Sequence, residues 1–278
     1  MTYCTYHVIP PLDRLELKRV VGWQHTFSWH MHDSYVLGIV TEGVARFTTS
    51  AGTYWVPPLH ISIIHPQQAH AGPVHHRQAI TQSNCYPSMR LMQSVATEEL
   101  GRPNQVPLFT EQVIADPALA RTILDVHEQL CGEAVAEALT DKTRGILATL
   151  MDKYATFIPE TDYWQSTGAI RRVCTYLRTH FYEPVAIRQL AALAGGVSEV
   201  HFTRQFRQQV GMPPYAYLTY RRVEEAKQRL QQHLPTAQTA LEVGFADQSH
   251  LTRQFKKMLG ITPGAYRRLY TSADRSVG

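Results

Sequence analysis

The chain has 278 residues, of which 44% are hydrophobic and 18% charged, and its formal net charge is +4. These values are ordinary for a folded globular chain, and the length favours two domains. No apolar run approaches the roughly 18 residues that a membrane span requires. The four cysteines lie far apart, as is typical of a reducing cytoplasm rather than of a disulfide-linked secreted domain. We therefore expect a cytoplasmic protein with no membrane partner.

Charge is distributed unevenly along the chain. Residues 168–278 carry 16 Lys and Arg against 7 Asp and Glu, a balance of +9, whereas residues 1–167 have a balance of −5. A basic region on an acidic remainder indicates that the C-terminal part meets a polyanion. A solvated basic surface explains the same numbers, so charge alone does not decide the partner.

Residues 1–90 are expected to form an antiparallel β-barrel. An apolar run at residues 36–40 ends at Glu42 and Gly43, and shorter runs follow at 45–48, 54–56 and 61–64. Pro57, Pro58 and Pro66 interrupt them. Short β-rich segments with frequent turns are typical of an antiparallel barrel or sandwich.

Helical spacing replaces this pattern in residues 91–160. Asp116 followed by Pro117 predicts the start of one helix, and a second is expected from about Asp141. These helices either cover the barrel or present an apolar stripe, formed by Ile146, Leu150 and Tyr154, for dimerisation. The sequence does not separate the two roles. Residues 161–168 are the predicted linker to a helical domain at 169–270.

The helical domain contains an internal repeat. Residues 197–217 align without a gap on residues 246–266, with nine identities in 21 positions. In each copy a short helix reaches a glycine turn, and a second helix then begins at Ser198 or Asp247, which are both good N-caps. This order predicts two helix-turn-helix motifs, at 187–208 and 236–257.

The second helix of each motif has an outward polar face that suits a DNA major groove. Arginine bonds guanine in a bidentate manner, and a valine can contact the thymine methyl group. The residues expected to contact DNA on this basis are Val200, Arg204, Arg207, Ser249, His250, Arg253, Lys256 and Lys257. The connecting helix at 215–232 spans about 27 Å, which suits two reading helices about one DNA turn apart. A repeated helical hairpin that binds protein is the alternative, and the positive charge favours DNA.

The same segment resembles a known family. Residues 244–256, from Gly244 through Asp247 and Phe255, together with 260–267, are similar to the signature of AraC/XylS-type transcription regulators. The resemblance covers about residues 170–269 and adds Thr203 and Gln248 to the expected base-reading positions. It implies a sequence-specific regulator, more commonly an activator that meets RNA polymerase. It also implies a homodimer joined through the helices at 116–154. Gly195–Gly196 departs from the family pattern.

The N-terminal region is similar to the cupin-like sensor domain of this family. The resemblance rests on Gly22, His30, Met31, His32, Gly43, Pro57 and His70. The implied overall fold is a two-domain α+β chain: a cupin-like barrel with following helices, then an all-α double helix-turn-helix domain. The expected effector-binding residues are His30, His32, Tyr35, Arg46, Trp55 and His70.

The three histidines leave several alternatives open. His30, His32 and His70 match the histidines of metal cupins, but the glutamate expected near Val36 is missing. Three histidines can still hold zinc with an open fourth position. An organic-effector pocket and structurally buried histidines are the other two interpretations. No catalytic residue is assigned, and a metal-dependent cupin enzyme or metal sensor joined to a DNA-binding domain is the competing class.

Overall fold

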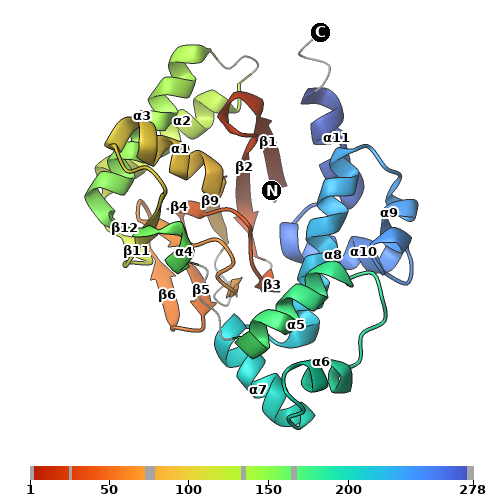
Figure 1. Ribbon diagram of the computed structural model, residues 1–278. Coiled ribbons are helices and arrows are strands. Elements are labelled where there is room, and N and C mark those ends of the chain that lie inside the picture. Colours follow the sequence, from red (N-terminus) through yellow and green to blue (C-terminus); the bar gives the residue numbers. More distant parts are fainter. Residues whose placement is uncertain (1–2, 25–26, 73–78, 133–135, 164–167, 274–278) are drawn as a thin grey trace.

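The computed structural model describes residues 3–24, 27–72, 79–132, 136–163 and 168–273 (Figure 1). A β-rich domain comes first and a helical domain follows, so the predicted order of two domains is confirmed. Of the predicted linker at 161–168, residues 164–167 lie outside the described residues, and α4 (Glu160–Tyr163) occupies the start.

The N-terminal domain is built from antiparallel strands in two main sheets. The larger sheet has the order β1-β2-β9-β4-β7-β11, and the smaller has the order β3-β8-β5-β6. The larger comprises β1 (Tyr3–Ile9), β2 (Leu15–Trp23), β4 (Val36–Glu42), β7 (Ile61–Ile64), β9 (Ile80–Tyr86) and β11 (Val113–Ile114). The smaller comprises β3 (Phe27–His30), β5 (Ala45–Thr49), β6 (Thr53–Val56) and β8 (His70–Gly72). A short helix (Pro10–Leu12) joins β1 to β2, and β10 (Gln105–Phe109) pairs with β12 (Ala155–Pro159).

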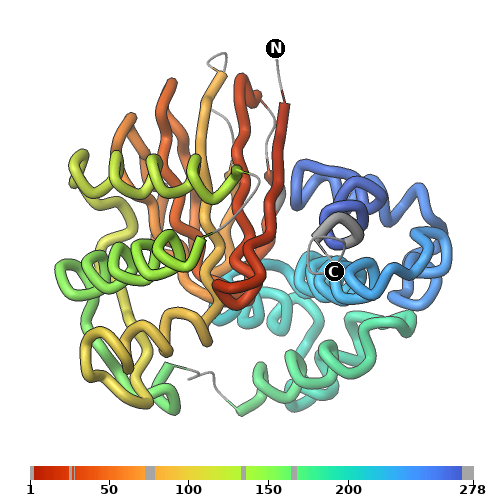
Figure 2. Tube along the Cα trace, turned by 90° about the horizontal axis from the view of Figure 1, so that it is seen from above, coloured from red at the N-terminus to blue at the C-terminus, as the bar shows by residue number. Residues whose placement is uncertain are grey.

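Helices cover the face of the larger sheet that points away from the smaller one (Figure 2). They are α1 (Met89–Leu100), α2 (Pro117–Leu130) and α3 (Glu137–Tyr154). Leu17, Leu37 and Ile63 of the sheet pack against Leu91 and Leu150 of the helices in one buried cluster. Burying such side chains is the main stabilising contribution of this layer, at about 1.5–3 kcal/mol each.

The stripe proposed for dimerisation belongs to this intramolecular layer. Leu150 is fully buried, and Ile146 and Tyr154 pack against the same cluster. The Tyr154 hydroxyl also donates a 2.8 Å hydrogen bond to Asp116. The sequence left two roles open for this stripe, and in the structure it covers the chain's own sheet. A homodimer therefore stays a prediction, and this stripe does not support it.

The C-terminal domain is all helical. It comprises α5 (Gly168–Thr179), α6 (Ile187–Leu193), α7 (Glu199–Val210), α8 (Pro214–Gln231), α9 (Thr236–Glu242), α10 (Gln248–Leu259) and α11 (Pro263–Ala273). The equivalent Phe206 and Phe255 of the repeat are both completely buried. The two helix-turn-helix units, α6–α7 and α9–α10, begin where the sequence predicts, and α8 joins them.

The helical domain docks against the β domain at several points. Tyr266 and Tyr270 of α11 donate hydrogen bonds of 2.7 and 2.8 Å to the carboxylate of Glu16 on β2. Tyr220 of α8 donates a 2.9 Å hydrogen bond to Asp33, which follows the end of β3. These contacts join residues about 190–250 positions apart in the chain.

The C-terminal ends of α7 and α10 lie directly against the β domain. Each helix ends at a glycine with a left-handed backbone, Gly211 at φ +86° and Gly260 at φ +85°. A Cβ atom at Gly211 would lie 2.8 Å from the Cβ of Ala69, and one at Gly260 would lie 3.1 Å from the Trp23 ring. Glycine therefore suits both positions through its backbone freedom and its lack of a side chain.

Candidate nucleic-acid interface and ligand cavity

Both helices predicted to read DNA, α7 and α10, begin at side-chain caps. The hydroxyl of Ser198 accepts a hydrogen bond from the backbone N–H of His201, and the carboxylate of Asp247 accepts one from His250. Such a cap satisfies one of the backbone N–H groups that an α-helix leaves unpaired at its start. The predicted N-caps are confirmed, and they fix where the outward face of each helix begins.

The residues predicted to contact DNA lie mainly on the exposed faces of α7 and α10. Val200 is 80% exposed, an unusual position for an aliphatic side chain. Also exposed are Arg204, Arg207, Gln248, Ser249, Arg253, Lys256 and Lys257. Thr203 and His250 are half-buried, with the Thr203 hydroxyl donating to the carbonyl of Glu199 and the His250 ring standing edge-on to Phe245.

Part of the basic charge counted in the C-terminal region is structural. Arg222 donates hydrogen bonds to the carbonyls of Phe181 and Glu183, and Arg229 pairs with Glu225 and Glu242. These arginines join α8 to its neighbours and are not available as a phosphate-binding surface. A net-charge count cannot make this distinction because it contains no information on which cations are paired.

A cavity of about 100 Å³ lies between the two sheets of the N-terminal domain. Strands from both sheets line it, and its wall is completed by Met258 and Leu259 from the end of α10. Phe27, Val36 and Ile64 contribute apolar surface, and the lining residues include no Asp or Glu among those described. The cavity thus combines residues of the N-terminal domain with the end of α10.

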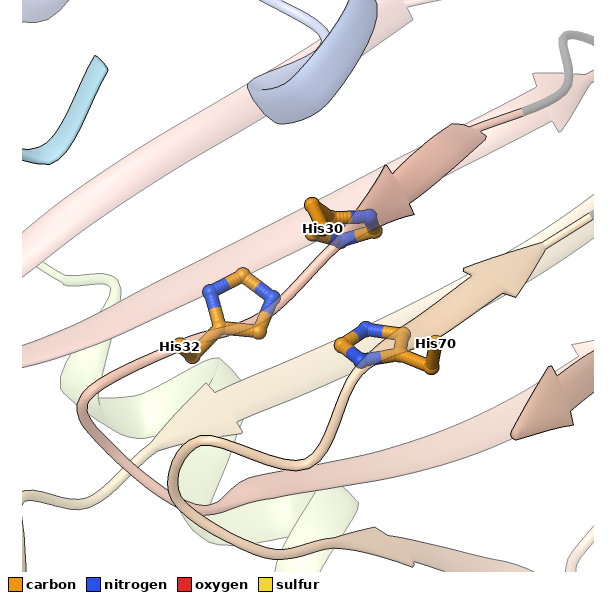
Figure 3. Close-up of side chains that lie close together, drawn as sticks. All are labelled: His30, His32 and His70. Carbon is orange, nitrogen blue, oxygen red and sulfur yellow. The ribbon is translucent and has the colours of Figure 1, made fainter. Parts of the chain in front are cut away.

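Three histidines converge at this cavity, as the sequence predicts (Figure 3). His30 ends β3, His32 follows it, and His70 begins β8. One ring nitrogen of each histidine lies within 4.8 Å of one ring nitrogen of each of the other two, and all three residues are buried. The centroids of the His30 and His70 rings are 4.2 Å apart.

Burial favours the neutral form of His32 and His70. It lowers the pKa of His70 to about 4 and the pKa of His32 well below its ordinary value. The Nδ1 of His70 lies 2.9 Å from the carbonyl oxygen of Gln68. Because a carbonyl only accepts, Nδ1 carries the proton and the lone pair of His70 is on Nε2. A carbonyl partner of this kind orients the ring of a metal-binding histidine.

Lys18 is a cavity residue that the sequence did not reveal. It is 4% exposed, its Nζ lies 4.4 Å from the centroid of the Phe27 ring, and burial lowers its pKa to about 8. The ammonium donates a 2.8 Å hydrogen bond to the carbonyl of Leu259 on α10, which also accepts one from the Tyr6 hydroxyl. A lysine is rarely buried without an oppositely charged partner. The burial of Lys18, which only the folded chain shows, therefore identifies it as a residue of the cavity.

The floor of the cavity is polar and uncharged. Ser62 donates a hydrogen bond to the carbonyl of Gly38, and Gln82 donates one to Asn84. A Cβ atom at Gly38 would lie 2.6 to 2.7 Å from the polar ends of these three side chains. Because Gly38 has no side chain, the amide groups of Gln82 and Asn84 and the hydroxyl of Ser62 can gather over it, where they can form hydrogen bonds with a ligand.

Two predicted effector residues, Tyr35 and Trp55, are not among the residues that line the cavity. Tyr35 is packed among the helices on the other face of the sheet, where its hydroxyl donates to the carbonyl of Pro107. Trp55 is 46% exposed, and the Arg46 guanidinium lies 5.3 Å from the centroid of its ring. Arg46 lines the cavity as predicted, between its more deeply buried neighbours Ala45 and Phe47.

Two family profiles match this chain. Residues 15–150 match the AraC-like ligand binding domain, and residues 191–269 match a helix-turn-helix domain. The chain belongs to the AraC family of transcription regulators. This AraC-family regulator has an N-terminal ligand-binding domain followed by a C-terminal DNA-binding domain, as in the fold described above. The HTH-type transcriptional regulator YbfI of Bacillus subtilis (strain 168) is 25% identical over 240 residues, 85% of this chain and 86% of the relative.

Solved structures of ToxT from Vibrio cholerae have a similar fold. An apo form of a point variant from strain SCE256 has a TM-score of 0.56 at 9% identity, covering 92% of this chain and 97% of that one. An unsaturated fatty acid-bound form of ToxT has a TM-score of 0.50 at 11% identity, covering 98% and 95%. The similarity extends over both domains and confirms the architecture of this AraC-family regulator. Within the described residues, no helix has the length and apolar character needed to cross a membrane.

Proposed function

We propose that α7 and α10 of this AraC-family regulator read an operator through their exposed faces. The proposed contacts are Val200, Thr203, Arg204, Arg207, Gln248, Ser249, His250, Arg253, Lys256 and Lys257. The observation that carries this proposal is that two capped helices in equivalent positions each expose a polar, basic face while burying the opposite one. We assign the arginines and the amide to base edges and the two lysines to phosphates.

We further propose that a compact organic acid is the effector. The ammonium of Lys18 faces a cavity with apolar walls and no carboxylate among its described lining residues, so a ligand anion would supply the missing negative charge. His30, His32 and His70 would donate or accept hydrogen bonds at the same cavity. Structures of ToxT named as bound to an unsaturated fatty acid and to a substituted butenoic acid also contain carboxylic acids.

Operator affinity measured with a panel of four- to eight-carbon monocarboxylates and their primary amides tests this proposal. At least one acid should change the affinity of the wild-type chain, and its uncharged amide should not. Lys18→Met and His70→Ala should lose the response. Arg121→Gln is the control, because that side chain is exposed on α2 and does not line the cavity. Equal responses to acid and amide, or a full response in His70→Ala, would contradict the assigned site.

A divalent metal ion at the three histidines is the second candidate. Tetrahedral zinc places its nitrogen ligands about 2.0–2.1 Å away, and hence about 3.4 Å from one another. Three buried imidazoles with nitrogens within 4.8 Å of one another fit this set after a modest contraction. We propose no catalytic step, because Val36 lines the cavity where metal cupins carry a glutamate.

We also propose that the protein acts in the cytoplasm as a homodimer that activates transcription through RNA polymerase. Activation is the commoner mode in the family. Sedimentation of the full chain tests the dimer, and transcription in vitro from the operator promoter, with and without the protein, tests activation.

A further inference from the structure

The residues beside the three histidines in the chain contact the DNA-binding domain. Met31 lies between His30 and His32, and Ala69 precedes His70. Both are almost fully buried, at 3% and 4% exposure, and both belong to the hydrophobic core of the C-terminal domain. Adjacent side chains of an extended segment point in opposite directions. The imidazoles therefore face the cavity while Met31 and Ala69 face the helices.

Further contacts fix the same two segments. Asp33, which follows His32, accepts a hydrogen bond from the Tyr220 hydroxyl at 2.9 Å and lies 3.7 Å from the guanidinium of Arg221. Ala69 lies against the end of α7, where Gly211 leaves room for it. The backbone N–H of Gln67 donates a 2.7 Å hydrogen bond to the carbonyl of His32, which ties the two segments to each other. Docking of the DNA-binding domain thus fixes both segments that carry the histidines.

We propose that a divalent metal ion held by His30, His32 and His70 strengthens the docking of the DNA-binding domain through Met31, Asp33 and Ala69. This inference rests on the metal candidate described under the proposed function. A ligand shifts a conformational equilibrium only by its difference in affinity for the two states. Undocking would expose Met31 and Ala69 to water and release the two histidine segments, so the docked state presents the better-ordered metal site.

The first experiment establishes the metal site in the full-length, metal-stripped chain. We expect Co²⁺ to give the absorption bands of a tetrahedral site and Zn²⁺ to displace it. His70→Gln should abolish the bands. His60→Gln, which changes a histidine outside the cluster, should leave them intact. Retention of the bands in His70→Gln would overturn both the metal candidate and this inference.

The second experiment tests the coupling alone. Tyr220→Phe removes the hydroxyl that bonds Asp33 and leaves all three histidines in place. Because a hydrogen bond to a charged carboxylate contributes about 1.5–3 kcal/mol and coupling is reciprocal, the Kd for Zn²⁺ should rise about tenfold or more. Tyr215→Phe is the matched control on the same helix, since its hydroxyl bonds Val185 within the C-terminal domain. An unchanged or lower Kd in Tyr220→Phe would overturn the coupling and leave the metal site standing.

Amide hydrogen exchange gives an independent measure of docking. Zn²⁺ should slow exchange in residues 207–217, at the end of α7, in the wild-type chain and not in His70→Gln. If Zn²⁺ bound the wild-type chain without slowing exchange there, the proposed strengthening of docking would be wrong.

Discussion

Glu16 accepts a 2.7 Å hydrogen bond from the hydroxyl of Tyr266, a residue 250 positions later in the chain. Tyr266 is the last matching position of the repeat, and its counterpart Tyr217 is buried within the helical domain. In the second copy the equivalent core tyrosine, Tyr266, therefore also makes a contact between the two domains. The nearby Tyr270 hydroxyl bonds the same carboxylate at 2.8 Å.

We expect Glu16→Gln and Tyr266→Phe to be energetically coupled. A hydrogen bond to a charged group contributes about 1.5–3 kcal/mol, so the double variant should lose less unfolding free energy than the two single losses combined. Urea denaturation of the full chain measures this. Tyr217→Phe with Glu16→Gln is the control pair and should be additive. Additivity in the Tyr266 pair would mean that the contact does not stabilise docking.

Arg253→Ala should weaken operator binding by about 1–3 kcal/mol and relax specificity at one base pair, because a groove-facing arginine reads base edges. Lys257→Ala should instead weaken all sequences alike and reduce the salt dependence. Gel-shift titration at several salt concentrations distinguishes the two results. Arg121→Ala, on the exposed face of α2, should have neither effect. Unchanged binding in both C-terminal variants would refute the assigned orientation.

The two N-caps offer a matched pair of variants. Ser198→Ala and Asp247→Ala should each cost about 0.5–2 kcal/mol of unfolding free energy, because each leaves a helix-start N–H without its acceptor. Asp247→Asn and Ser198→Thr should restore most of it. Chemical denaturation measures the four values. A loss as large in the restoring variants as in the alanine variants would show that capping is not the cause.

Acid should destabilise the fold through His65. The backbone N–H of Phe109 donates a 2.9 Å hydrogen bond to Nε2 of His65, and burial lowers the pKa of this histidine from 6.5 to about 4. Between these values the unfolded chain binds more protons than the folded one. The contribution is therefore complete above about pH 6.5 and is lost as the pH falls toward 4, by about 3 kcal/mol in all.

His65→Gln isolates this effect because the glutamine side chain can accept the bond but does not titrate. Unfolding free energies of the variant should fall less steeply than those of the wild type between pH 6.5 and 4.5. Parallel pH dependences in the two chains would exclude His65 as a source of acid sensitivity.

The helical domain could be predicted because its signals are local. Ser198, Asp247, Gly211 and Gly260 mark helix starts and ends by their own backbone and side-chain chemistry, whatever surrounds them. The first strands were missed for the opposite reason. Leu15–Trp23 contains Glu16, Lys18 and Arg19, and the hydrogen-bond partners of Glu16 and Lys18 lie about 240–250 positions away.

The cavity was predicted in part. The resemblance to metal cupins grouped His30, His32 and His70, and the structure brings the three together where β3 pairs with β8. Tyr35 was misplaced because a shift of one residue along a strand exchanges the two faces of a sheet. Trp55 was misplaced for the same reason, whereas Arg46 lines the cavity as predicted. No periodic pattern identifies Lys18 as an inward-facing cation, since its acceptor is a carbonyl on α10.

Gly211 and Gly260 occupy the same position in the two copies of the repeat, and both lie against the N-terminal domain, one on Ala69 and the other on Trp23. The equivalent ends of α7 and α10 thus both pack against the N-terminal domain, which supports them. While the domains are docked, the distance between the two reading helices is fixed by that support as well as by α8. If α7 and α10 read DNA as proposed, the half-site separation that the protein accepts is a property of the whole chain, and we expect an isolated C-terminal domain to accept a wider range of separations.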